Sequence, residues 1–327
     1  MVKQNYLENI DFIKGFAAIS VILLHTLPLS VLYSSFAVYH IWQAVPLFLF
    51  ITFYLGFSNF EKTGNVFEDY YSKGRVKKVF QKLWLPLLIL AVFEAIFFIS
   101  LGNSSRAASS LLCINNGPGS YYIWVYMQLW LLLPLIYALL KKRGCLIGGC
   151  MLLIISIIAD CVVEKYISLT PGFFSFRYLF LSVPAYMYLQ GIKIKEIWSL
   201  ILLSVVYLFL MHYSGLPERF DPVLPNGWEA QTSLGFFYTF FLFVILSKSY
   251  EKVKTQWITK YIVHLGTISW EIFLVQMVLL GSGIVEFISP TLFPSVYLYI
   301  GFKIIFILGI SLLFAELYNK FLSVINH

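Results

Sequence analysis

The chain consists of long apolar stretches separated by short polar segments. Many of these stretches run for about 17–22 residues, which is long enough to cross the hydrocarbon of a bilayer as a helix. They do not alternate with a period of two, as the strands of a membrane barrel do. The pattern predicts an all-α, polytopic bundle of about ten spanning helices, at residues 12–32, 41–58, 83–101, 122–140, 145–161, 174–191, 197–213, 233–248, 263–283 and 297–317.

The separation between the fourth and fifth predicted helices is the narrowest. Only the polar run 141–144, Lys-Lys-Arg-Gly, divides an apolar region that extends from residue 122 to residue 161. Proline also interrupts three of the predicted helices, at Pro46, Pro134 and Pro184. Because proline lacks a backbone N–H, we expect these helices to be kinked or to open backbone groups toward a cavity.

The composition places this bundle in a membrane. Hydrophobic residues make up 60% of the chain and charged residues 12%, whereas an ordinary soluble domain has about a quarter charged residues. The first apolar segment contains Asp11 and Lys14 and lacks a small-residue cleavage site, so we expect it to remain as a spanning helix. No loop is longer than about 25 residues or has the periodicity of a folded domain, which predicts a single transmembrane domain over residues 1–327.

The positive charges lie mainly on one side of the predicted bundle. Alternation of the ten helices places 17 lysine and arginine residues on the side of the termini, and three on the other, namely Arg106, Lys165 and Arg219. Cytoplasmic loops carry an excess of positive charge, so both termini are predicted to be cytoplasmic in a multi-pass protein of the inner or plasma membrane. The same rule explains the net charge of +7, and no nucleic-acid partner is predicted.

Three ionisable residues lie on one face of the first predicted helix. At about 100° per residue, Lys14 and His25 project from the same side, roughly 16 Å apart along the axis, and Asp11 lies within about 40° of them. Ionisable groups at membrane depth are costly and usually mark a pathway or a reaction site. The ordinary alternative is a lysine that snorkels to the surface and a histidine that bonds to a neighbouring helix. With the N-terminus inside, His25 falls in the outer half of the bilayer.

Five short motifs follow one another along the chain. They are Asp11-x-x-Lys14 with His25, the Val-Pro-Leu-Phe segment at 45–48, Lys73-Gly74-Arg75, the Gly-Ser-Tyr-Tyr-Ile-Trp segment at 119–124 with Gln128, and the Ser-Trp-Glu-Ile-Phe-Leu-Val-Gln segment at 269–276. In this order they resemble the acyltransferase family 3 membrane proteins. The chain departs from the family's usual residues in having Lys14 for Arg, Thr52 for Ser, Phe53 for Gly and Gln276 for His.

The resemblance implies acyl transfer, usually of acetyl, from cytoplasmic acyl-CoA to a hydroxyl of a carbohydrate or another cell-envelope acceptor. Such a reaction needs a base for the hydroxyl proton, and an imidazole with a pKa of about 6.5 can accept and return that proton near neutrality. We therefore expect His25 to be the general base. Asp11 and Lys14 are expected to form a charge pair at the cytoplasmic mouth, and Lys14 could equally meet a CoA phosphate.

Charged residues elsewhere extend the predicted site. The loop cations Lys73, Arg75 and Lys78 would bind the phosphates of acetyl-CoA. Their ordinary explanation is that any cytoplasmic loop is basic for orientation alone. Either Glu94 or Glu271 would fix the tautomer of the catalytic imidazole, and the sequence leaves that choice open.

Aromatic and amide side chains are expected to contact the acceptor. An interfacial aromatic belt and hydrogen bonds between helices are the ordinary explanations for such residues. The candidates are Tyr122, Trp124, Gln128, Gln276 and Trp228.

Other classes of function fit parts of the same pattern. Proline-broken helices and a polar stripe would also suit a transporter or exporter of a sugar or small polar solute. The departures at Phe53 and Gln276 would suit a catalytically inactive family member that assists polysaccharide export. The four cysteines have no metal-ligand spacing with histidine, so no metal site is predicted. The expected partners are the lipid bilayer and a carbohydrate acceptor, such as a capsule polysaccharide or a lipid-linked glycan, and a homo-oligomer stays open.

Overall fold

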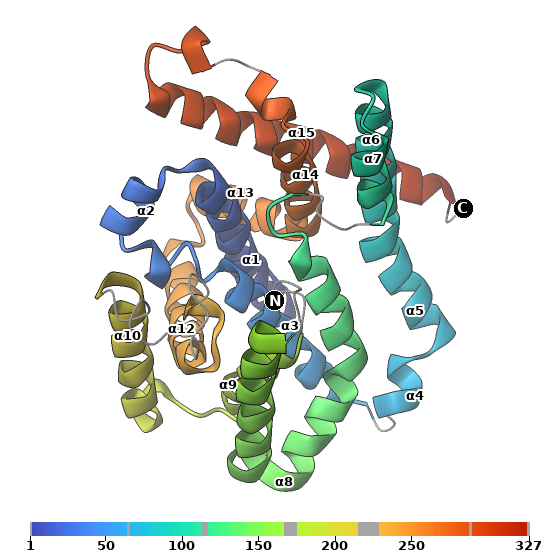
Figure 1. Cartoon of the computed structure of the whole chain (residues 1–327). Coiled ribbons are helices and arrows are strands. Elements are labelled where there is room, and N and C mark those ends of the chain that lie inside the picture. The colour runs from blue at the N-terminus through green and yellow to red at the C-terminus, as the bar shows by residue number, and fades with distance from the viewer. Residues whose placement is uncertain are drawn as a thin grey trace.

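The computed structural model describes residues 2–63, 66–112, 117–166, 175–214, 229–287 and 290–325. Within these ranges every regular element is a helix, which confirms the all-α class predicted from the sequence. The helices pack into one bundle, with the long α15 lying across one end of the view in Figure 1.

The α-helices follow the apolar stretches, with shorter helices between them. They are α1 (Val2–Thr26), α2 (Leu29–Ser34), α3 (Ala44–Phe60), α4 (Val66–Tyr70), α5 (Lys73–Val79), α6 (Leu85–Ser100), α7 (Ser104–Leu111), α8 (Tyr121–Tyr166), α9 (Ser182–Leu189), α10 (Trp198–Tyr213), α12 (Phe236–Val253), α13 (Trp257–Thr267), α14 (Ser269–Gly281) and α15 (Val296–Ile325). Short elements join them, including the π-helix η2 (Phe80–Trp84) and the 3-10 helices η4 (Ser175–Leu181), η5 (Ile194–Glu196) and η6 (Glu229–Gln231).

Fewer helices of the described chain are long and apolar enough to span a membrane than the ten that the sequence predicts. Five helical segments of the described chain are long and apolar enough to cross a membrane, and a sixth is added if the bent pair α13–α14 counts as one span. The predicted count of about ten is therefore not confirmed. Three features account for the difference. Residues 175–189 are divided between η4 and α9, α10 is shorter than the five long segments, and α8 is counted once although it turns at Gly144 between two predicted crossings.

The narrow separation predicted at 141–144 is a turn inside α8. Gly144 has φ +74° and ψ 170°, values outside the helical region, so α8 is two helices that meet there. Figure 1 shows the two arms as a hairpin. A positive φ is free of steric cost only for glycine, which explains the residue type at this turn.

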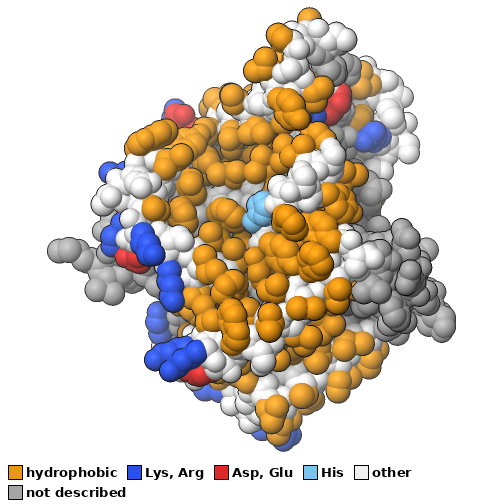
Figure 2. Space-filling view, turned by 90° about the vertical axis from the view of Figure 1, so that its left-hand side faces the viewer, with side chains coloured by type: hydrophobic (Ala, Val, Ile, Leu, Met, Phe, Trp, Pro, Cys, Tyr) orange, Lys and Arg blue, Asp and Glu red, His pale blue; other side chains and the backbone are white. Residues whose placement is uncertain are grey.

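The outer surface has a broad apolar face, shown in Figure 2. Large hydrophobic side chains are exposed on several helices, among them Phe93 on α6, Leu203 on α10 and Ile305 on α15. Lysine and arginine side chains gather along one edge of the face, at the left of Figure 2. An apolar band with cations on one side is the arrangement that the positive-inside rule leads us to expect. That this edge is cytoplasmic stays a prediction.

Helix α1 packs most extensively against α13. Glycine allows the close approach on both helices: a Cβ on Gly15 would overlap the backbone oxygen of Ile262, and a Cβ on Gly266 would overlap that of Asp11. Small residues let membrane helices approach one another in this way. The crossing holds the polar start of α1 beside the C-terminal end of α13.

The chain bends by 74° between α13 and α14. The Thr267 hydroxyl donates a hydrogen bond to the carbonyl oxygen of His264, at 2.7 Å, and Ile268 has non-helical angles of φ −113° and ψ 21°. Hydroxyl side chains that bond to the backbone compete with continuation of a helix. Discontinuous helices of this kind present backbone groups to binding sites inside membrane proteins.

A π-helix, η2, joins α5 to α6. Pro86 lies in the first turn of α6 and has no N–H for the carbonyl four residues earlier, next to the widened segment Phe80–Trp84. Two side chains from other helices donate to carbonyl oxygens of η2, the indole N–H of Trp270 at 3.3 Å and the hydroxyl of Tyr318. Segments of π-helix recur at functional sites, and this one borders the cavity described next.

Candidate active site

A cavity of about 420 Å³ lies where α1, α3, α5, α8 and the α13–α14 bend converge. We call it the central chamber. Its size is within the usual range for small-molecule sites. Along α8 its lining runs from Tyr122 to Leu133, about 16 Å of helix, so the cavity is elongated. The lining residues are Lys14, Phe48, Ile51, Thr52, Leu55, Gly56, Tyr70, Arg75, Val79, Leu83, Tyr122, Tyr126, Trp130, Leu133, Gly266, Thr267, Ser269, Trp270 and Phe273.

Aromatic rings form one wall of the central chamber. Tyr122 of α8 lies against Phe273 of α14, with ring centroids 5.1 Å apart, and Tyr126 lies against Trp270 at 5.9 Å. Phe48 of α3 contacts Tyr122 at 6.2 Å. The rings meet in the tilted and edge-on arrangements that aromatic pairs prefer. Such a wall suits the apolar part of a ligand.

Arg75 is one of two cations in the chamber. Its guanidinium carbon lies 4.7 Å from the centre of the Tyr70 ring. In the amide orientation that satisfies both groups, the Asn59 oxygen accepts two hydrogen bonds from this guanidinium, at 3.0 and 3.2 Å. Burial raises the pKa of Tyr70 well above its usual range, so its phenol is neutral. An arginine held by a neutral amide and a neutral ring keeps its full charge for an anionic ligand.

Lys14 supplies the second cation. Its Nζ lies 3.0 Å from Oδ1 of Asp11, one helical turn earlier, so the charge pair expected from the sequence is present. The residues that line the chamber include two cations and no carboxylate. Asp11 compensates the charge of Lys14, so Arg75, which has no ion pair within the described chain, is the cation that favours an anionic ligand here.

His25 lies near the C-terminal end of α1, about 16 Å along the helix from Lys14. It is partly buried and does not line the central chamber. The adjacent Thr26 is buried and donates its hydroxyl to the carbonyl oxygen of Ile22, at 2.8 Å. The structure thus separates the predicted base from Lys14 along the axis of α1, as the sequence spacing requires.

The predicted carboxylates and one predicted amide lie outside the chamber. Glu94 is buried in α6, and Glu271 on α14 is partly buried within electrostatic reach of Lys82. Gln128 accepts a hydrogen bond from the backbone N–H of Ser175, at 3.1 Å, which ties the start of η4 to α8. None of the three lines the central chamber.

The remaining acceptor candidates have different surroundings. Tyr122 lines the chamber, whereas Trp124 is partly buried and packs against the core. Gln276 is fully buried on α14, and its side-chain amide has no hydrogen-bond partner within the ranges that the structure describes. Trp228 lies outside the described residues.

Three of the predicted site residues therefore meet in the central chamber, namely Lys14, Arg75 and Tyr122. The other two loop cations, Lys73 and Lys78, are exposed and do not line it. Arg75 of α5 thus faces the cavity, while its neighbours Lys73 and Lys78 on the same helix face outward.

Most of the aromatic lining was not singled out from the sequence. Tyr122, Tyr126 and Trp130 recur every fourth residue along α8, and Tyr70 precedes the basic loop. A spacing of four residues places side chains on one face of a helix. This aromatic stripe was the signal that could have identified the wall.

A second buried polar cluster also escaped the sequence analysis. Arg177 in η4 is 1% exposed, and its guanidinium lies 5.9 Å from the Tyr178 ring. Tyr121 and Tyr178 both donate their hydroxyls to Oε1 of Gln231, at 3.1 and 2.6 Å. A single arginine inside the predicted span 174–191 was the available signal, because cations at membrane depth are rare.

Comparison with known protein families gives one match. A family model described as an acyltransferase domain matches residues 7–316, which include all five motifs. The chain belongs to acyltransferase family 3. No curated protein and no solved structure matches it. Together with its apolar helices, this membership makes the chain a membrane acyltransferase.

Two departures of this acyltransferase from the family's usual residues have structural explanations. Phe53 is fully buried in the core of the bundle, at a position where the family commonly has glycine. The glycine of α3 that lies close to α8 is Gly56, where a Cβ would overlap the Leu133 side chain. Thr52 lines the chamber and keeps a hydroxyl, which donates to the carbonyl oxygen four residues earlier at 2.9 Å.

Proposed function

We propose that this acyltransferase transfers an acetyl group from cytoplasmic acetyl-CoA to a hydroxyl of a cell-surface polysaccharide or lipid-linked glycan. The observation that carries the proposal is the central chamber. It joins two cations, Lys14 and Arg75, to an aromatic wall inside the domain that the family assigns to acyl transfer. A ligand with phosphate groups at one end and an uncharged remainder would match this chamber, because the phosphates would meet the cations and the remainder would meet the aromatic wall.

The donor would enter from the edge that carries the basic loops. Arg75 and Lys14 would bind the phosphates of acetyl-CoA inside the chamber. Lys73 and Lys78, exposed nearby on the same helix, would raise the local concentration of the anionic donor without contacting it. The aromatic wall would then receive the pantetheine arm and the acetyl group.

His25 would act as the general base. The acceptor O–H gives its proton to the imidazole while its oxygen attacks the thioester carbonyl carbon. The carbon–sulfur bond then breaks, and the imidazolium gives this proton to the departing CoA thiolate. Lys14 and His25 are eleven positions apart on α1, and Tyr122 and Leu133 of the chamber lining are eleven positions apart on α8, about 16 Å in both cases. A donor held by Arg75 and Lys14 would extend along the chamber, and the proposal requires the reacting end of the donor to reach His25.

The assignment of the base is tested with purified protein in lipid nanodiscs. His25→Ala should reduce transfer of acetyl from acetyl-CoA to a glycan acceptor by at least about 100-fold, the range expected for loss of a general base. The exposed His264 provides a matched control, and His264→Ala should keep its activity. Size-exclusion and thermal unfolding profiles establish that both variants are folded. Undiminished transfer by a folded His25→Ala variant would end the catalytic role of this residue.

A second candidate function is transport of a sugar or small polar solute. The observation that favours it is the 74° bend between α13 and α14 beside the chamber, since transporters use discontinuous helices at their binding sites. The two functions are separated by incubating the detergent-purified protein with acetyl-CoA. An acyltransferase releases CoA by transfer or slow hydrolysis, whereas a transporter releases none and moves solute into vesicles. A catalytically inactive member that assists export would do neither.

A further inference from the structure

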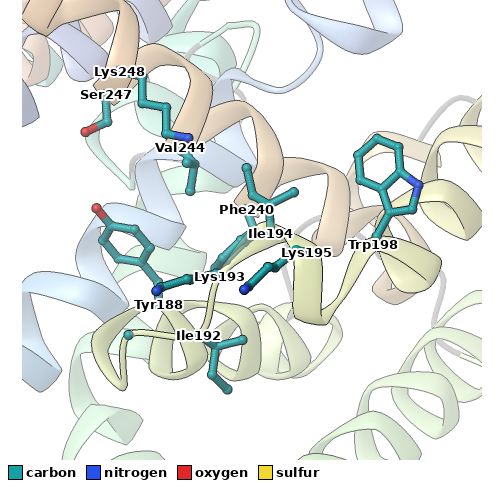
Figure 3. Close-up of a pocket in the computed structure, with 11 residues that line it drawn as sticks. Tyr188, Ile192, Lys193, Ile194, Lys195, Trp198, Phe240, Val244, Ser247 and Lys248 are labelled. Atoms are coloured by element: carbon teal, nitrogen blue, oxygen red, sulfur yellow. The ribbon is translucent and has the colours of Figure 1, made fainter.

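A second cavity, of about 910 Å³, opens between α9, α10 and α12 (Figure 3). Lys193 and Lys195 project into it from the segment between α9 and α10, and Lys248 reaches it from α12. Trp198 and Phe240 add aromatic surface. We call this cavity, defined by these five residues, the lysine pocket. It shares no lining residue with the central chamber.

The three ammonium groups of the lysine pocket are not neutralised by the protein. None of them forms an ion pair within the described part of the chain. Glu196, beside Lys195 in the sequence, is exposed and does not line the pocket. The carboxylate of Glu251, one turn after Lys248, lies 2.8 Å from Lys254. The pocket therefore has three positive charges available for an external anion.

The surroundings of the pocket are those of a membrane interface. Trp198 is 52% exposed at the start of α10, and Leu202 and Ile245 are exposed on α10 and α12 beyond the pocket. Phe240 and Val244 form an apolar part of its wall. Tryptophan and lysine gather where lipid headgroups meet hydrocarbon. The lysine pocket thus adjoins the apolar surface that faces lipid.

The positive-inside rule does not by itself explain this arrangement. It accounts for Lys193 and Lys195 in a loop, because any cytoplasmic loop is basic. It does not require Lys248, which belongs to a different helix, to face the same cavity as those two residues and Trp198. Basic pockets between membrane helices on the cytoplasmic side are sites for anionic lipid headgroups.

We propose that the lysine pocket binds the phosphate headgroup of an anionic phospholipid. Lys193, Lys195 and Lys248 hold the phosphate, and the acyl chains lie along the exposed apolar surface of α10 and α12. The site is separate from the central chamber and does not rest on the acetyltransferase activity.

Native mass spectrometry of the purified full-length protein tests this site, with phosphatidylglycerol and phosphatidylcholine as the probes. The triple variant Lys193→Gln, Lys195→Gln, Lys248→Gln should bind phosphatidylglycerol at least about tenfold more weakly than the wild type. A control triple variant that removes the same charge from exposed lysines outside the pocket, Lys142→Gln, Lys252→Gln, Lys260→Gln, should bind as the wild type does. Equal binding by both triple variants would overturn the proposal.

Two further arms separate the lipid from soluble phosphates. Inorganic phosphate and acetyl-CoA are added in turn as competitors. Neither should displace phosphatidylglycerol, because neither has acyl chains for the apolar surface. Displacement by either one at a concentration equal to that of the lipid would assign the pocket to a soluble phosphate and overturn the lipid site.

A fluorescence measurement tests the same lipid site without the triple variant, so its result does not depend on whether that variant folds. Brominated phosphatidylglycerol should quench the tryptophan fluorescence of the wild type more than brominated phosphatidylcholine does. This difference should disappear in Trp198→Phe, because Trp198 lines the pocket. Equal quenching of the wild type by the two lipids would also overturn the proposal.

Discussion

Gln276 is a polar side chain enclosed by apolar neighbours. It is fully buried, and neither its amide oxygen nor its amide nitrogen has a hydrogen-bond partner within the described residues. Val275 and Met277, on either side of it in α14, are buried as well. A buried polar group without a partner costs roughly 1–3 kcal/mol. The unpaired amide therefore lowers the stability of the bundle around α14, and it does not line the central chamber.

Replacing this amide tests that interpretation. Gln276→Leu should raise the free energy of unfolding by about 1 kcal/mol, because leucine fills similar volume without unpaired polar atoms. Gln128→Leu is the matched control: it removes the hydrogen bond to Ser175 and should lower stability. Thermal unfolding in detergent measures both, and a Gln276→Leu variant less stable than the wild type would contradict this account.

The sequence identifies individual site residues only where spacing on one helix determines the contact. Asp11 and Lys14 are three positions apart, so one helix brings them together, and their ion pair could be predicted. The support of Arg75 by Asn59 and Tyr70 joins different helices and could not. Arg177 was overlooked for another reason. It lies inside an apolar stretch, whereas the orientation argument considers only the charges of the loops.

At the scale of elements, the crossing of α1 and α13 determines where the chamber begins. Gly15 and Gly266 bring the two backbones together, and Gly266 also lines the chamber. Lys14 lies next to one glycine in the sequence and its partner Asp11 touches the other. The position of the first cation thus depends on two residues without side chains.

This crossing can be tested with a matched pair of glycines. Gly266→Ala should lower the free energy of unfolding by about 1–3 kcal/mol, because its Cβ would overlap the backbone of Asp11. Gly309→Ala, in α15, adds the same methyl group where nothing lies within 4 Å, and should raise stability by up to about 1 kcal/mol. Unfolding in detergent compares the two. Equal stability of both variants would mean that the α1–α13 crossing is looser than described.

Elements marked by strong local signals were predictable, and breaks without such signals were not. The turn at Gly144 follows a run of three cations inside an apolar region, and both the run and the glycine are visible in the sequence. The predicted single crossing at 263–283 is instead the bent pair α13–α14. Neither Gly nor Pro occupies the break at 268, which a side-chain hydroxyl at Thr267 helps to form. The bend depends on local bonding that hydropathy does not detect.

At the scale of the whole molecule, the proposals for both cationic sites depend on the same orientation of the protein in the membrane. The apolar face is bounded by lysine and arginine along one edge, as Figure 2 shows. On the predicted topology the central chamber receives its donor from that edge, and the lysine pocket lies there too. Both proposals therefore require the basic loops to be cytoplasmic.

Cysteine labelling tests the orientation. In a variant with all four native cysteines replaced by serine, Lys142→Cys lies at the α8 turn and Ser104→Cys at the start of α7, both exposed positions. A membrane-impermeant maleimide should label Ser104→Cys in intact cells and Lys142→Cys only after the membrane is opened. The reverse pattern would place the basic loops outside and remove the cytoplasmic route to the chamber.

The most direct test of the central claim is the affinity of the purified protein, in nanodiscs, for acetyl-CoA. A hydrogen bond from a charged group contributes about 1.5–3 kcal/mol, so Arg75→Ala should weaken binding by at least about tenfold. Lys142→Ala, which removes an exposed cation outside the chamber, should leave the affinity unchanged. Equal affinity of Arg75→Ala and the wild type would contradict the assignment of the central chamber to acetyl-CoA.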